Sequence, residues 1–151
     1  MPVIADIKFC GLTRAEDAEY AAALGAAYVG VIFAGGPRAL TVDQADAVLR
    51  DVPRTVRRVG VFAGQSASEI APAARRLALD VVQLHGGSDG SRIADLRRVF
   101  DGAVWPVVRV TDGVFPAIAL DLIAAGDGLL LDPFVEGALG GTGVTLPWTT
   151  M

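Results

Sequence analysis

The sequence predicts an α/β protein with a parallel sheet, built either as a doubly wound sheet or as a (βα)8 barrel. Short apolar runs alternate along the chain with stretches of helical character, and this alternation is typical of parallel sheets. The runs are apolar almost throughout, as expected for strands that helices cover. The chain has 151 residues, of which 52% are hydrophobic and 20% charged, and these values fit one globular domain over residues 1–151.

Six strands and four helices are expected in alternation. The strands are β-branched apolar runs at residues 6–11, 28–33, 57–62, 81–86, 105–110 and 128–132. The helices lie at residues 13–25, 41–52, 66–79 and 88–100, and each is expected to begin on a hydroxyl N-cap. The predicted caps are Thr13 with Glu16 in a capping box, Thr41, Ser66 with Glu69, and either Ser88 or Ser91, while Gly25 ends the first helix.

The segment of residues 20–37 carries no charge and is long enough to be considered as a membrane span. Its first half is rich in alanine, its second half is β-branched and aromatic, and Gly25 divides the two. We therefore expect a helix followed by a strand, and no contact with a membrane.

Net charge and cysteine content restrict the partners and the location of the chain. The formal net charge of -4 and the pI near 4.8 do not favour nucleic acid, whose phosphates need clustered Lys and Arg. A single cysteine forms no intramolecular disulfide, and the first residues lack the layout of a signal peptide. A cytoplasmic protein is the expectation.

The number of strands falls short of a closed barrel. A (βα)8 barrel ordinarily needs at least about 200 residues, so six strands leave about two βα units missing. If the sheet is of the barrel type, it is incomplete, and its first and last strands have open edges, which favour self-association with another chain.

Candidate functional residues stand at the carboxyl ends of the expected strands, where ligands bind in parallel α/β folds. Cys10 is either a small buried filler or a reactive thiol. Lys8 points to the same face, and its charge either favours the thiolate or forms a salt bridge at the base of the strand. Asp132 either starts a turn before Pro133 or provides a proton from an apolar cleft.

Three further candidates also have two interpretations each. His85 is either a hydrogen-bonded core histidine or a catalytic one. Arg38 follows a glycine pair and a proline, and its guanidinium either holds a substrate carboxylate or caps a helix end. The glycine-rich segment 137–143 either closes over a ligand or is only a connector, and it lacks the lysine of a P-loop.

Six motifs in order resemble the phosphoribosylanthranilate isomerase family of tryptophan biosynthesis: "KFCG", "GVIF" followed by "PR", "VGVF", "VQLHG", "LLLD", and "GGTG" followed by Trp148. The resemblance implies a (βα)8, or TIM-barrel, fold in incomplete form. It also implies an aldose–ketose isomerisation, the Amadori rearrangement of N-(5-phosphoribosyl)anthranilate to 1-(2-carboxyphenylamino)-1-deoxyribulose 5-phosphate, with no metal and no organic cofactor.

The resemblance also assigns roles to residues. It implies that Cys10 is the general base that removes the ribose C2′ proton, and that Asp132 is the general acid that protonates the ring oxygen. Arg38 would bind the anthranilate carboxylate, and His85 would line the site in a supporting role. The segment that would cover the bound substrate contains Gly140, Gly141 and Gly143.

The chain departs from the family pattern at Gly36, where a serine is usual, and at Pro147, where an acidic residue is usual. The loops that hold the substrate phosphate in the family follow two strands that are not among those expected here. A non-catalytic barrel fragment that acts as an interaction module is therefore the alternative. A sugar-phosphate isomerase of histidine synthesis fits less well, because its chemistry expects an aspartate where Cys10 stands.

Overall fold

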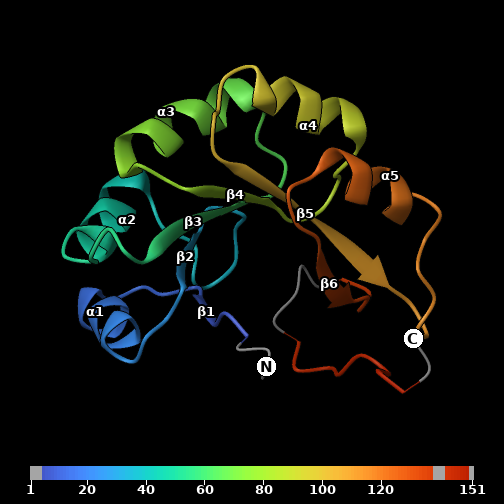
Figure 1. Cartoon of the computed structure of the whole chain (residues 1–151), viewed down its shortest axis with the longest axis horizontal. Helices are drawn as coiled ribbons and strands as arrows, with labels where there is room; N and C mark the ends of the chain where they lie inside the picture. Colours follow the sequence, from blue (N-terminus) through green and yellow to red (C-terminus); the bar gives the residue numbers. More distant parts are fainter. Residues whose placement is uncertain (1–4, 138–141, 150–151) are drawn as a thin grey trace.

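The structure is a computed structural model that describes residues 5–137 and 142–149 (Figure 1). Within these ranges strands and helices alternate along the chain, as the sequence predicts. The strands are β1 (Lys8–Cys10), β2 (Tyr28–Ile32), β3 (Arg57–Phe62), β4 (Val81–Leu84), β5 (Ala103–Val110) and β6 (Leu130–Pro133). The helices are α1 (Ala15–Ala23), α2 (Val42–Leu49), α3 (Ala67–Leu77), α4 (Gly90–Arg97) and α5 (Ala119–Ala125).

The strands form one parallel sheet in chain order, from β1 to β6. The sheet is curved and the helices lie outside the curve, so the arrangement is a half-barrel (Figure 1). Among the described residues, β1 and β6 are the two edges of the sheet. The prediction of an incomplete (βα)8 barrel is confirmed. The alternative of a doubly wound sheet, which has helices on both faces, is wrong.

The convex face of the sheet carries the main core. Alternate side chains of each strand point outward, and Val31 of β2 and Leu84 of β4 are 0% exposed there. The helices contribute residues such as Ile70 of α3, which is 1% exposed. Covering helices thus explain why the strands read as continuous apolar runs.

The concave face has a smaller apolar cluster near the amino ends of the strands. Tyr28, Val59 and Val81 form it, and Trp105 packs against them with its ring centroid 4.9 Å from that of Tyr28. This cluster closes the bottom of the half-barrel and leaves the carboxyl end of the concave face for polar side chains.

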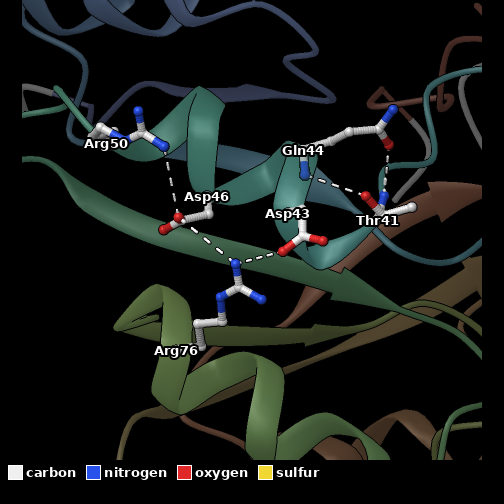
Figure 2. Close-up of polar contacts among 6 residues, drawn as sticks. All are labelled: Thr41, Asp43, Gln44, Asp46, Arg50 and Arg76. Atoms are coloured by element: carbon white, nitrogen blue, oxygen red, sulfur yellow. Dashed lines mark hydrogen bonds and ion pairs between the residues drawn. The ribbon is translucent and has the colours of Figure 1, made fainter.

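Two predicted N-caps, Thr41 and Ser66, are confirmed, and both belong to capping boxes. At the start of α2, Thr41 Oγ1 accepts from the Gln44 N–H at 3.2 Å and Gln44 Oε1 accepts from the Thr41 N–H at 2.9 Å (Figure 2). At the start of α3, the Ser66 N–H donates to the Glu69 carboxylate at 2.8 Å. Gly25 follows the C-cap of α1 with φ +86°, also as predicted.

The predicted cap of the first helix is wrong. α1 begins at Ala15 and its N-cap is Arg14, with no side-chain cap. Glu16, which was expected to reach back to Thr13, forms an ion pair with Arg14 instead. A cation next to the first turn therefore removed the acceptor that a capping box needs.

The predicted cap of the fourth helix is also wrong. α4 has Asp89 as its N-cap, whose carboxylate accepts from the Arg92 N–H at 2.8 Å, in place of Ser88 or Ser91. A carboxylate is favoured over a hydroxyl here because it is a charged acceptor at the positive end of the helix. α5 was not predicted; its N-cap is Ile118, which makes no side-chain cap.

The exposed sides of α2 and α3 are joined by charged residues. Arg76 of α3 lies 2.5 Å from Asp43 and 3.9 Å from Asp46, and Arg50 also pairs with Asp46 at 3.9 Å (Figure 2). These side chains are largely exposed to solvent, so the ion pairs contribute little to the stability of the fold.

A buried arginine joins the same two βα units from within. Arg58 of β3 is 8% exposed, and its backbone N–H donates to Asp80 Oδ2 at 2.7 Å. Its Nη1 donates to the Leu77 carbonyl at 3.1 Å and its Nη2 to the Val52 carbonyl at 3.3 Å. The guanidinium thus lies at the carboxyl ends of α2 and α3, where a positive charge is favourable.

Residues 20–37 are divided between α1 and β2, as predicted. In the described part of the chain there is no helix with the length and apolar character needed to cross a membrane.

Candidate active site

The carboxyl ends of the strands surround one cavity of about 870 Å³. Its lining comes from the ends of β1, β2, β3 and β4, from the loop after β2, and from the segment after β6. The lining residues are Cys10, Ile32, Ala34, Gly35, Gly36, Pro37, Arg38, Val61, Gln83, His85 and Gly137. Three of the residues singled out from the sequence, at positions 10, 38 and 85, therefore meet in one place.

Cys10 is exposed and ends β1 at this cavity. The interpretation of Cys10 as a buried filler is wrong. Its neighbour in the sheet register is Gly30, and a Cβ at Gly30 would lie 3.4 Å from Cys10 Sγ. The sulfur thus occupies space that the missing side chain leaves on the concave face.

Lys8 reaches the same space from two positions earlier on β1. Its Nζ would lie 3.5 Å from a Cβ at Gly30, and it donates to Gln83 Oε1 at 3.0 Å. Gln83 comes from the middle of the sheet and is 4% exposed. Lys8 therefore points into the half-barrel towards a neutral acceptor, a partner that was not predicted from the sequence.

Arg38 lies at the rim of the cavity. Its Nη1 donates to the Cys10 carbonyl at 3.4 Å and would lie 2.7 Å from a Cβ at Gly11. Gly11 has φ +74°, so its lack of a side chain serves both the turn and the approach of the guanidinium. The rest of Arg38 is exposed and can receive an anion; Gly36, where a serine was usual, has φ +86°.

His85 lines the cavity and forms a pair with Asp132, which is not among the lining residues. His85 Nε2 lies 3.5 Å from Asp132 Oδ2, and the two side chains are 12% and 21% exposed. Among the described residues neither of these two atoms has a hydrogen-bond partner. Both atoms are buried and face each other at ion-pair distance.

Electrostatics around His85 favour the neutral imidazole. Burial lowers the pKa of His85 from its ordinary value, and the carboxylate of Asp132 opposes this effect. The cations Arg109 and Lys8 act in the same direction as burial. Arg109 of β5 lies opposite Asp132 in the register, so its charge belongs to this end of the site.

Two side chains that the sequence did not point to tie the loops around the cavity together. Gln65 Nε2 donates to the Phe33 carbonyl at 2.8 Å. Arg92 Nη1 donates to the Gly86 carbonyl at 2.9 Å, and its Nη2 donates to the carbonyls of Ala63 and Gln65. The ends of β2, β3 and β4 are therefore held in fixed positions.

The glycine-rich segment after β6 is only partly covered by the described residues. Gly140 and Gly141 lie outside them. Gly143 is exposed with φ +73° and is not among the residues that line the cavity, whereas Gly137 is. Within residues 5–137 and 142–149 there is no group of three or more His, Cys, Asp or Glu that would hold a metal ion.

A curved parallel sheet with helices outside it and polar side chains at its carboxyl edge defines the class of (βα)8-barrel proteins. The model of the family described as N-(5'phosphoribosyl)anthranilate (PRA) isomerase matches residues 7–151. The chain belongs to the phosphoribosylanthranilate isomerase family.

Curated relatives with the name N-(5'-phosphoribosyl)anthranilate isomerase match nearly the whole chain. The protein of Bacillus velezensis is 35% identical over 143 residues, which are 95% of this chain and 65% of the relative. That of Acidithiobacillus ferrooxidans is 39% identical over 149 residues, or 98% of this chain and 70% of the relative. The chain thus spans about two thirds of the length of these relatives.

Solved structures agree with this placement. The phosphoribosyl anthranilate isomerase of Thermus thermophilus superposes with a TM-score of 0.80 at 29% identity, covering 97% of this chain and 69% of that one. A second isomerase, in complex with reduced 1-(o-carboxyphenylamino)-1-deoxyribulose 5-phosphate, gives a TM-score of 0.72 at 28% identity over 87% of this chain and 66% of that one.

Proposed function

We propose that this chain catalyses the isomerisation of N-(5-phosphoribosyl)anthranilate to 1-(2-carboxyphenylamino)-1-deoxyribulose 5-phosphate, a step of tryptophan biosynthesis in the cytoplasm. One observation carries the proposal. Cys10, which is exposed, lines a single cavity together with Arg38 and His85, and His85 pairs with Asp132.

The reaction needs a proton donor and a proton acceptor on opposite sides of the sugar. Asp132 gives a proton to the ring oxygen as the C1′–O bond breaks, which leaves an iminium at C1′. The Cys10 thiolate then takes the proton from C2′ and leaves an enaminol. The enaminol becomes the ketone when C1′ gains a proton and the C2′ hydroxyl loses one, so that no proton is gained or lost overall. Hydrogen moves within one molecule, so the chemistry proposed here needs neither an external oxidant nor a metal.

Substrate recognition is proposed for the residues at the rim. Arg38 would bind the anthranilate carboxylate, for which the planar guanidinium offers two parallel donors. His85 would line the site beside Asp132. Gly140, Gly141 and Gly143 would cover the substrate, and the complex of a relative with a reduced carboxyphenylamino-deoxyribulose phosphate supports a ligand of this class.

The test is the loss of anthranilate-type fluorescence when substrate is generated in situ with the purified chain. We expect turnover, and we expect Cys10→Ala and Asp132→Asn each to lower kcat/KM by at least about 10²-fold, since general acid–base groups contribute that much. Arg76→Ala, on the far side of α3, is the matched control and keeps full activity. No turnover from a chain that unfolds cooperatively would contradict the proposal.

A second candidate function is an interaction module that associates through its sheet edges. Apolar side chains are exposed at both ends of the sheet: Ile7 before β1 is 57% exposed, and Leu120 and Ile123 of α5 are 75% and 54% exposed. Open sheet edges with exposed apolar side chains near them favour pairing with another chain. Light scattering over a range of concentrations tests it, and Leu120→Glu would shift an associating chain towards monomer.

A further inference from the structure

We propose that Lys8 is a positioning residue for Cys10, and that its ammonium group, fixed by Gln83, favours the thiolate form of the Cys10 side chain. The inference rests on the proposed function, in which the thiolate takes a carbon-bound proton. It gives a role to the only charged residue of β1.

The geometry places the two side chains in one small space. Lys8 and Cys10 are two positions apart on a strand and therefore point to the same face. Both come within 3.5 Å of the point where a Cβ of Gly30 would lie, Sγ at 3.4 Å and Nζ at 3.5 Å. Gly30 is the register partner of Cys10, so the sheet itself keeps this space open.

The hydrogen-bond partner of the Lys8 ammonium is neutral. Lys8 Nζ donates to Gln83 Oε1 at 3.0 Å, and the burial of Gln83 fixes the acceptor. No carboxylate of the described residues lies within ion-pair distance of Lys8, so the alternative of a salt bridge at the strand base is not realised. A glutamine holds the lysine without cancelling its charge.

The remaining charged and titratable groups around the cavity come from the other strand ends. Asp132 of β6 is engaged with His85, 3.5 Å away, and it stands beside a cation of β5. The charge of Lys8 also acts on His85, where it contributes to lowering the pKa of the imidazole. The groups are Arg38 after β2, His85 after β4, Arg109 of β5 and Asp132 of β6.

A cation at this range acts on the sulfur through space. It favours the thiolate over the thiol, and the thiolate is the form that accepts a proton. For a pair at the edge of a water-filled cavity the expected change in thiolate fraction is about three- to tenfold.

The composition of the chain makes the test selective, because Cys10 is its only cysteine and Lys8 its only lysine. The second-order rate of alkylation by iodoacetamide, measured from about pH 6 to pH 10, reports the thiolate fraction of Cys10 directly. The variants are Lys8→Met, Lys8→Arg as the charge-conserving control, and Gln83→Glu, which keeps the shape and adds a compensating charge.

We expect Lys8→Met and Gln83→Glu to be alkylated about three- to tenfold more slowly than the wild type near pH 7 and at the same rate near pH 10, where the thiol is ionised in every variant. Lys8→Arg should follow the wild type. A merely structural change would alter the rate at every pH, because it changes access. Should Lys8→Met fail to fold, Gln83→Glu carries the test.

Coincident pH curves for the wild type, Lys8→Met and Gln83→Glu would overturn the role of Lys8, whatever the turnover. The measurement needs no substrate, so the two proposals fail separately. Shifted alkylation curves without isomerase turnover would overturn the proposed function and leave the pairing of Lys8 with Cys10 in place.

Discussion

The convex and concave faces of the sheet are made by alternate residues of the same strands, yet they are built in different ways. On β4, Leu84 points outward and is 0% exposed among apolar neighbours, whereas Gln83 points inward and accepts from Lys8 at 3.0 Å. The outward residues need only be apolar and of the right volume. Towards the carboxyl ends of the strands, polar inward residues meet particular partners, as Gln83 meets Lys8 and His85 meets Asp132. Neighbouring residues of one strand therefore serve the packed core and the cavity in turn, so a substitution can change stability or the site separately.

The largest difference between the faces is expected for truncations. Ile70→Ala removes a fully buried side chain of the convex core and should lower the free energy of unfolding by about 2–5 kcal/mol. Cys10→Ala removes an exposed side chain of the concave face and should change it by less than about 0.5 kcal/mol. Urea denaturation of both variants measures this. Equal losses would mean that the concave face also carries the fold.

Two glycines, one on each face of the sheet, test the same difference between the faces when a methyl group is added to each. Gly60→Ala places a Cβ 2.5 Å from Leu79 and 2.7 Å from Phe62, both buried in the convex core, and should cost about 1–3 kcal/mol. Gly30→Ala meets Cys10 and Lys8 at 3.4 Å, so its stability should change by less than about 1 kcal/mol. Thermal unfolding separates the two, and a larger loss for Gly30→Ala would contradict the contrast.

On the concave face, His85 is expected to make the free energy of unfolding depend on pH. Burial lowers the pKa of this histidine in the folded chain, so the unfolded chain binds more protons in that range. The free energy of unfolding should therefore fall as the pH falls below about 6.5, the ordinary histidine value. His85→Gln removes the titrating group and should flatten the curve of unfolding free energy between about pH 6.5 and pH 5. A steeper curve for the variant would show the sign to be wrong.

The smallest effect is expected outside both faces. Arg76→Ala breaks the ion pairs with Asp43 and Asp46 on the exposed sides of α2 and α3 (Figure 2). The side chains of Arg76 and Asp43 are more than half exposed to solvent. Such pairs contribute little, and the free energy of unfolding should change by less than about 0.5 kcal/mol. A change above about 1 kcal/mol by urea denaturation would show that this surface carries part of the fold.

The order of the elements could be predicted because alternation of apolar runs and helical stretches is a local property of the chain. The predicted caps Thr41 and Ser66 are confirmed, and in the structure the third helical residues, Gln44 and Glu69, accept from their backbone N–H groups. The other predicted caps failed where a charged neighbour competed, as Arg14 did for Glu16 and Asp89 did for the nearby serines. α5 has no side-chain cap, so the sequence carried no start signal for it.

The site was predictable in part for a related reason. Residues at the carboxyl ends of strands can be found along one sequence, and Cys10, Arg38 and His85 do line one cavity. The pairing of Lys8 with Gln83 depends on which residues of distant strands lie level with each other. Register between strands is set by tertiary packing, so one sequence does not reveal it.

The hydrogen bonds of Arg58 have a consequence for local unfolding. Its two terminal nitrogens are bound to carbonyls at the ends of two different helices, at Val52 and Leu77. If the end of α2 frayed alone, a buried cation would lose an acceptor, at a cost of about 1–3 kcal/mol or more. The βα units on the two sides of β3 are therefore expected to unfold as one cooperative unit, and their amide hydrogens to exchange with solvent together.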